Sequence, residues 1–181
     1  MASFSERIIG AAKLDPATYE EVEKDPTALS QAMAVVALSA VAAGIGAFRS
    51  GGGGIVVTVL VSLVAWFIWA GITFLVGTKI MPEPQTKSSF EELLRTIGFS
   101  AAPGMARVAG FVPIVGGLIS FGAGVWMLVA MVVAVRQALD YSTTGKAVAV
   151  CAVGFLIYMA AIFTLTMMMA FFGIAASGFR G

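Results

Sequence analysis

Residues 55–78 read IVVTVLVSLVAWFIWAGITFLVGT, an apolar run without a charged side chain. An α-helix rises about 1.5 Å per residue and the hydrocarbon core of a bilayer is about 30 Å thick, so a run of this length predicts a membrane-spanning helix. The blocks 28–48, 117–137 and 147–172 have the same character, with charge confined to their ends. The sequence therefore predicts an all-α, multi-pass transmembrane helical bundle.

The composition agrees with this class and excludes several others. Hydrophobic residues make up 59% of the chain and charged residues 12%, whereas about a quarter of the residues in a soluble domain are charged. A net charge of +1 indicates no nucleic-acid partner. Histidine and asparagine are absent, which excludes Ser-His and Cys-His nucleophile pairs and any histidine-containing metal site, and the lone Cys151 excludes a disulfide within the chain. We predict no catalytic residue, no metal site and no cofactor.

The segment 90–111 is the ambiguous part of the bundle. Ser89 and Glu92 form a capping-box pattern, which predicts a helix that begins near Phe90. Pro103-Gly104 then interrupts the apolar pattern. We expect a third span here, short and kinked, which gives five spans; in the alternative, the segment only dips into the membrane and four spans remain.

Residues 1–27 precede the transmembrane domain (28–172), and residues 173–181 are expected to form a short tail. Each of the steps Asp15-Pro16 and Asp25-Pro26 pairs an N-cap carboxylate with a proline suited to the first helical position, so each should start a helix. Before them, an interfacial amphipathic helix is predicted, with one apolar and one charged face. The apolar face holds Phe4, Ile8, Ile9 and Ala12, and the charged face holds Glu6, Arg7 and Lys13.

The distribution of Lys and Arg predicts that the N-terminus is cytoplasmic in a cell (inner) membrane. With five spans, eight of these residues lie on the cytoplasmic side and three outside. The cytoplasmic set is Arg7, Lys13, Lys24, Lys79, Lys87, Arg95, Arg136 and Lys146; the outer set is Arg49, Arg107 and Arg180. Four spans also give eight against three, so charge counting cannot decide the number of spans or the side of the C-terminus.

Charged and helix-breaking residues near the ends of spans are candidate sites. Arg107 is interpreted as a boundary charge that lies about one turn from the outer surface, where its stem can snorkel, with a substrate site as the alternative. Arg136 and Asp140 are four residues apart and are predicted to form an ion pair at the inner end of their span. Pro103, Gly104 and Pro113 are the candidate helix breaks.

Small residues and tryptophans suggest packing surfaces. Two small-residue ladders, which serve either internal packing or an oligomer face, are Gly116, Ser120 and Gly124, and Ala130, Ala134 and Ala138. The three tryptophans, Trp66, Trp69 and Trp126, fall at predicted mid-depth and should face other helices. Each indole N–H then needs a partner such as Ser62 or Thr73. A pocket for a lipid or small molecule among the tryptophans is the alternative.

Three segments carry a resemblance over almost the whole chain: Tyr19-Glu20-Glu21-Val22-Glu23, Ala102-Pro103-Gly104 and Arg136-Gln137-Ala138-Leu139-Asp140. Together they resemble the bacterial Yip/Yif-type (Yip domain) family of integral membrane proteins. Eukaryotic members of this family interact with Rab GTPases, have five spans and a cytoplasmic N-terminus, and act in vesicle traffic and membrane shaping. The resemblance implies five spans here. The aspartate- and glycine-rich signatures of the eukaryotic proteins are not matched, so Rab binding is not carried over.

The leading functional hypothesis is a non-enzymatic scaffold or partner-binding subunit. Its partners would be membrane lipids and either a second copy of the chain, as a homo-oligomer, or another membrane protein. The alternative is a small-molecule, lipid or ion transporter or channel formed by an oligomer, in which the break at Pro103-Gly104 lines a cavity. A membrane-bound enzyme ranks last because the sequence offers no convincing catalytic set.

Overall fold

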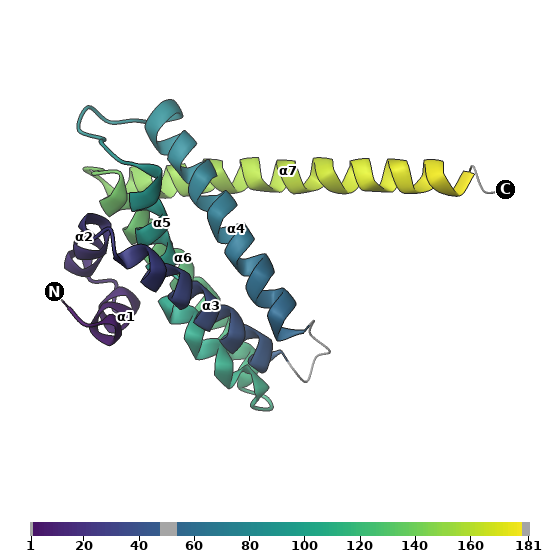
Figure 1. The fold of residues 1–181 in the computed structure, drawn as a ribbon, viewed down its shortest axis with the longest axis horizontal. Coiled ribbons are helices and arrows are strands. Elements are labelled where there is room, and N and C mark those ends of the chain that lie inside the picture. Colours follow the sequence, from purple (N-terminus) through teal and green to yellow (C-terminus); the bar gives the residue numbers. More distant parts are fainter. Residues whose placement is uncertain (1, 48–53, 179–181) are drawn as a thin grey trace.

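The computed structural model describes residues 2–47 and 54–178, with side chains described as far as Phe171. These residues form helices and the connections between them (Figure 1). In chain order the elements are α1 (Phe4–Ala12), α2 (Pro16–Lys24), α3 (Ala28–Gly46), α4 (Ile55–Leu75), the π-helical turn η2 (Val76–Ile80), α5 (Phe90–Phe99), the 3₁₀ segment η3 (Ala102–Phe111), α6 (Gly116–Ala138) and α7 (Thr144–Gly178).

The bundle has two ends of different character (Figure 1). At one, here called the N-terminal end, α2 and the end of α6 lie near the connections 81–89 and 139–143. Helix α1 packs beside the middle of α6, where the indole of Trp126 donates to the carbonyl of Ala12. At the other, the far end, lie the end of α3, the start of α4 and the connection 112–115. Helices α3, α4 and α6 run between the two ends, whereas α7 leaves the bundle obliquely and projects beyond it.

Four helices in the described part of the chain are long and apolar enough to cross a membrane: Ala28–Gly46, Ile55–Ile80, Gly116–Ala138 and Thr144–Phe171. The prediction of an all-helical, multi-pass membrane chain is therefore confirmed. The last helix begins before the predicted residue 147 and continues to Gly178, into the segment expected to be a tail. Residues 48 and 179–181, which complete the first predicted span and the tail, lie outside the described residues, as do Arg49 and Arg180.

The predicted third span is not one α-helix. Ser89 caps α5 with the expected capping box: its hydroxyl accepts from Glu92 N–H and its own N–H donates to Glu92 Oε2 at 2.7 Å. This helix ends at Phe99, and the chain continues as η3, with Pro103 in its first turn. Because neither piece is a long helix, the segment 90–111 is not among the four candidate spans.

Close backbone contacts explain the 3₁₀ geometry of η3. This segment packs between α3 and α6. A Cβ atom at Gly46 would collide with the carbonyl oxygen of Arg107, and one at Gly104 would collide with the Ser39 hydroxyl. Glycine at these two positions lets the backbones approach each other, and the thinner 3₁₀ helix fits in the remaining space.

The N-terminal helices dock on the bundle through a buried arginine, which corrects the predicted arrangement of α1. Arg7 was placed on the charged outer face, but it is 2% exposed. Its guanidinium donates to Glu21 at 2.9 Å, to Asp25 at 2.7 Å and to the amide oxygen of Gln31 at 3.0 Å. The apolar face is divided, with Ile9 half exposed and its neighbours packed against the core.

The two Asp-Pro steps behave differently. Asp15 caps α2 as predicted, because its carboxylate accepts from Ala17 N–H at 3.1 Å and Pro16 is the first helical residue. Asp25 does not cap α3, which begins at Ala28. Its carboxylate instead accepts from Arg7 and from the N–H of Thr27. The second step therefore forms the turn between two helices and not the start of the next one.

Candidate functional site

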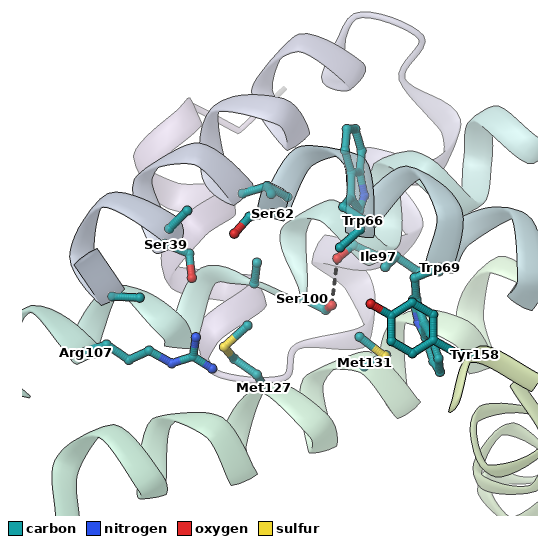
Figure 2. Close-up of a pocket in the computed structure, with 15 residues that line it drawn as sticks. Ser39, Ser62, Trp66, Trp69, Ile97, Ser100, Arg107, Met127, Met131 and Tyr158 are labelled. Atoms are coloured by element: carbon teal, nitrogen blue, oxygen red, sulfur yellow. Dashed lines mark hydrogen bonds between the residues drawn. The ribbon is translucent and has the colours of Figure 1, made fainter. Parts of the chain in front are cut away.

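A cavity of about 310 Å³ lies between α3, α4, the α5–η3 segment and α6, with one wall residue, Tyr158, from α7 (Figure 2). Its volume is near the lower limit for small-ligand pockets, about 300 Å³. In Figure 2, Ser39 and Arg107 lie at one side of the cavity, and Trp69 and Tyr158 lie at the other. The cavity is the place where the break-containing segment meets three of the candidate spans.

Aromatic and thioether side chains form much of the wall. Trp66 and Trp69 come from α4, and Met127 and Met131 come from α6. The ring of Trp69 meets that of Tyr158 edge to face, with a centroid distance of 6.2 Å. These side chains give a polarizable apolar surface, which suits a hydrocarbon ligand.

The tryptophans do not use the predicted hydroxyl partners. Trp66 donates its indole N–H to the carbonyl of Leu94 at 3.2 Å, and Trp126 donates to the carbonyl of Ala12 at 2.7 Å. The indole nitrogen of Trp69 is buried and has no hydrogen-bond partner within the described residues, and the same holds for the hydroxyl of Thr73. Trp126 lies outside the cavity, so only two of the three tryptophans contribute to it.

Three serine hydroxyls also line the cavity. Ser100 donates to the carbonyl of Ile97 at 2.7 Å, one turn back in its own segment. Ser39 is 3% exposed, and no hydrogen bond joins its hydroxyl to another described residue. The predicted helix break adjoins this group, since Gly104 packs against Ser39 and Met127 and both Pro103 and Gly104 are buried. Pro113 lies elsewhere, exposed in the turn at the far end.

Arg107 brings a positive charge to the cavity. Its side chain leaves η3 and extends toward Met127 (Figure 2), and its Nη2 atom passes close to Gly124 on α6. The sequence contains ten Asp and Glu residues, and none lies in 28–82 or 93–139, the segments that build the cavity. Accordingly, Arg107 forms no ion pair or hydrogen bond through its side chain within the described part of the chain. The predicted boundary charge thus points into a cavity.

The other candidate residues hold the chain together. Ala130, Ala134 and Ala138 are fully buried. Gly116 packs against the backbone of Gly110, and Ser120 also lies against Gly110. In this structure α6 therefore uses its small residues, including Gly124 beside Arg107, for contacts within the chain.

The predicted pair of Arg136 with Asp140 is not formed. Helix α6 ends at Ala138, and Asp140 has a left-handed backbone (φ 51°), so the helical i, i+4 spacing is lost. Arg136 instead donates to the carbonyls of Tyr141 and Ser142 at 3.3 Å and to the Thr144 hydroxyl at 3.1 Å. This arginine fixes the turn into α7.

Sequence reasoning missed a second polar cluster, at the N-terminal end. Arg95 on α5 is 5% exposed, and its Nε–H donates to the carbonyls of Val22 and Glu23 at 3.1 and 3.0 Å. Glu23 is 8% exposed, and its Oε2 atom has no hydrogen-bond partner within the described residues. The only signal of this cluster in the sequence is the run of glutamates in α2.

Burial and hydrogen bonding move the pKa values of two carboxyls at the N-terminal end, Glu23 and Asp25, in opposite directions. Burial, together with the negative charges of Glu20, Asp140 and Glu92, raises the pKa of Glu23 to about 7. Hydrogen bonds from Thr27 and Arg7 lower the pKa of Asp25 to about 2. At the N-terminal end the chain therefore stabilises the charged form of Asp25 and disfavours the charged form of Glu23.

Comparison with known proteins gives one match. A family model described as the Yip1 domain matches residues 14–165, which cover most of the chain. No curated protein and no solved structure matches the sequence.

Proposed function

The chain belongs to the Yip1 domain family, and from this premise we propose that it is a non-enzymatic membrane protein that binds a partner membrane protein through α7. The observation that carries this proposal is the exposure of α7: every described residue from Met159 to Phe171 is exposed. Gly154 and Tyr158, in the first half of the helix, pack against Trp69 on α4. Beyond them the helix projects alone (Figure 1).

The exposed part of α7 is suited to helix packing within a membrane. The hydroxyls of Thr164 and Thr166 donate to the carbonyls of Ala160 and Ile162, four residues earlier, at 2.8 Å. Both hydroxyl hydrogens are therefore satisfied within the helix and do not require hydrogen bonds to water. Ala160 and Thr164 present a small-xxx-small face, and such faces allow a second helix to approach closely. The partner is another membrane protein or a second copy of this chain.

We further propose five crossings with the N-terminus in the cytoplasm. Segments α5 and η3 contain 10 residues each, and at about 1.5 and 2.0 Å per residue they extend for roughly 35 Å, enough for a hydrocarbon core of about 30 Å. The chain enters this pair of segments at the N-terminal end and leaves at the far end (Figure 1). Five of the basic residues assigned to the cytoplasm belong to the end of α2, to η2, to the connection 81–89, to the end of α6 or to the start of α7, as the positive-inside rule requires if the N-terminal end is cytoplasmic. They are Lys24, Lys79, Lys87, Arg136 and Lys146.

The partner proposal is tested by gentle extraction from native membranes and by measurement of the mass and composition of the recovered particle. We expect a second protein, or a second copy, in fixed stoichiometry. Thr164→Leu adds bulk to the small-residue face and should abolish its recovery. The matched control is Thr58→Leu on α4, where the threonine hydroxyl likewise donates to a carbonyl four residues earlier, that of Gly54. Recovery of the wild-type chain as a monomer without a partner would contradict the proposal.

The cavity supports a second candidate function, the transport of a small molecule, lipid or ion by an oligomer. Its position between the candidate spans favours this function, as do the few polar groups of its lining, the serine hydroxyls and Arg107. Flux of a loaded solute or lipid across reconstituted vesicles tests it, with Ala65→Leu, which fills the cavity, as the inactive variant. Equal flux through the wild type and this variant would show that transport does not pass through the cavity.

A further inference from the structure

We propose that the cavity binds a single-chain anionic lipid, with the phosphate headgroup on Arg107 and the acyl chain along Trp66, Trp69 and Met131. The inference stands whether or not the chain transports the ligand and whether or not α7 binds a partner. It rests on the charge of the cavity, its shape, and an apolar groove beside it.

The charge argument begins with the missing counter-ion. A guanidinium enclosed among membrane-spanning segments is costly unless it is paired, hydrated or at the interface. Arg107 has no carboxylate in any segment that forms the cavity, because all ten of the chain's Asp and Glu residues lie outside residues 28–82 and 93–139. Any anion that pairs with Arg107 therefore comes from outside these segments. A lipid phosphate fits, because an arginine fork binds phosphate oxygens with two parallel hydrogen bonds.

A second donor lies on the same side of the cavity. The Ser39 hydroxyl is buried and faces Arg107 from α3, without a hydrogen bond to another described residue (Figure 2). A guanidinium and a free hydroxyl together form a site for an anionic oxygen cluster. The rest of the cavity offers no further positive charge, so a single monoanionic or dianionic head is expected.

The shape argument selects one acyl chain. A volume of about 310 Å³ is small for a two-chain phospholipid, and most of the lining is apolar. From Arg107 the cavity extends past Met127 and Met131 to Trp69 and Tyr158 (Figure 2). A separate groove of about 310 Å³, lined by side chains of α4 and by Tyr158, shares Ala65 and Tyr158 with the cavity. A chain that fills the cavity can therefore continue into this groove and into lipid.

The depth of Arg107 agrees with such a lipid. Arg107 packs beside Gly46, the last residue of α3, and so lies toward the far end. Trp69 lies toward the end of α4 that adjoins the N-terminal end. The headgroup would thus sit closer to the far surface, with its chain directed toward the middle of the membrane, the orientation of a lipid in that leaflet.

The test uses the purified full chain in a neutral detergent and a single-chain lysophosphatidate whose acyl chain carries bromine. Bromine quenches tryptophan fluorescence on contact, and Trp66 and Trp69 lie on the cavity wall. We expect saturable quenching, with affinity at least tenfold weaker for the brominated monoacylglycerol, which has the same chain and no phosphate. Inorganic phosphate at millimolar concentration should not displace the probe.

Variants test which residues bind the phosphate headgroup and which bind the acyl chain. Arg107→Met should weaken phosphate-probe binding at least tenfold, to the level of the neutral probe, and Arg107→Lys should retain it within a few fold. Ala65→Leu should weaken both probes, because it fills the space for the chain. The control Lys87→Met removes an exposed cation from the connection 81–89 and should change neither.

Three results would overturn the proposal. Equal affinity for the phosphate and neutral probes would show that Arg107 only snorkels to the surface. Displacement of the probe by inorganic phosphate would make the site one for free anions. Unchanged binding in Ala65→Leu would place the acyl chain outside the cavity. The comparison of the two probes uses the wild-type chain and so does not depend on the folding of any variant.

Discussion

Arg7 is buried and Arg107 is half-buried among helices, and the chain supplies charged partners only to the first. Arg7, at the N-terminal end, donates to Glu21, Asp25 and Gln31, at distances of 2.7 to 3.0 Å. Arg107, on the cavity wall, has no such partner among the described residues, and no carboxylate occurs in the segments around it. A guanidinium whose charge its own chain pairs is part of the folded framework. One that the chain leaves unpaired is available to a ligand.

The largest expected effect comes from removing the paired arginine, Arg7. Arg7→Met leaves Asp25 without its guanidinium and separates α1 from α2 and α3. Breaking a buried pair by removing one partner typically costs about 3–5 kcal/mol. We expect a loss of this size in the free energy of unfolding, measured by denaturant titration in detergent, together with rapid proteolysis within residues 2–27. A loss below about 1 kcal/mol would mean that Arg7 does not hold the N-terminal helices on the bundle.

The difference between the two arginines also shows what sequence could predict. Hydropathy located the four long helices, and the Ser89 and Asp15 caps located two starts correctly, because these signals are local. Burial of Arg7 was not predictable from the amphipathic pattern, because that pattern places charged side chains on the solvent-exposed face. The partners of Arg7 also lie 14 to 24 residues away in the sequence.

The 3₁₀ segment and the cavity required information from distant residues. Proline at position 103 predicted an interruption, but the thin helix that follows depends on contacts with Gly46 and Ser39 on α3. Arg107 was identified from its charge alone. Its direction was not predicted, although the absence of any carboxylate from the adjacent segments was visible in the sequence and indicates an unpaired cation.

Glu23 is an intermediate case, because it is a buried carboxyl at the N-terminal end, and among the described residues its Oε2 atom has no hydrogen-bond partner. Its pKa is raised to about 7 from an ordinary value of 4.5, mainly by burial and then by Glu20, Asp140 and Glu92, against a small opposing effect of Lys24. The folded state thus binds this proton more tightly than the unfolded state. Its contribution to stability is complete below about pH 4.5 and is lost as the pH rises to about 7.

Glu23→Gln should remove this dependence. At pH 8 we expect the variant to be more stable than the wild type by up to about 3 kcal/mol, because a neutral amide avoids the cost of a buried charge. The slope of unfolding free energy against pH between 5 and 7 should become flatter. A variant less stable than the wild type at pH 8 would show that the ionised carboxylate has a partner.

The smallest effect on stability is expected for the unpaired arginine. Arg107→Met keeps the apolar stem of the side chain and breaks no hydrogen bond of the described chain, so the free energy of unfolding in neutral detergent should change by less than about 0.5 kcal/mol. A loss as large as that of Arg7→Met would mean that the chain itself pairs Arg107, and the contrast between the two arginines would fail.

Addition of the lysophosphatidate probe should stabilise the wild type and leave the stability of Arg107→Met unchanged, because a ligand stabilises only a folded state that binds it. The two arginines would then have different roles: Arg7 determines whether the N-terminal end is folded, and Arg107 determines which ligand the cavity binds.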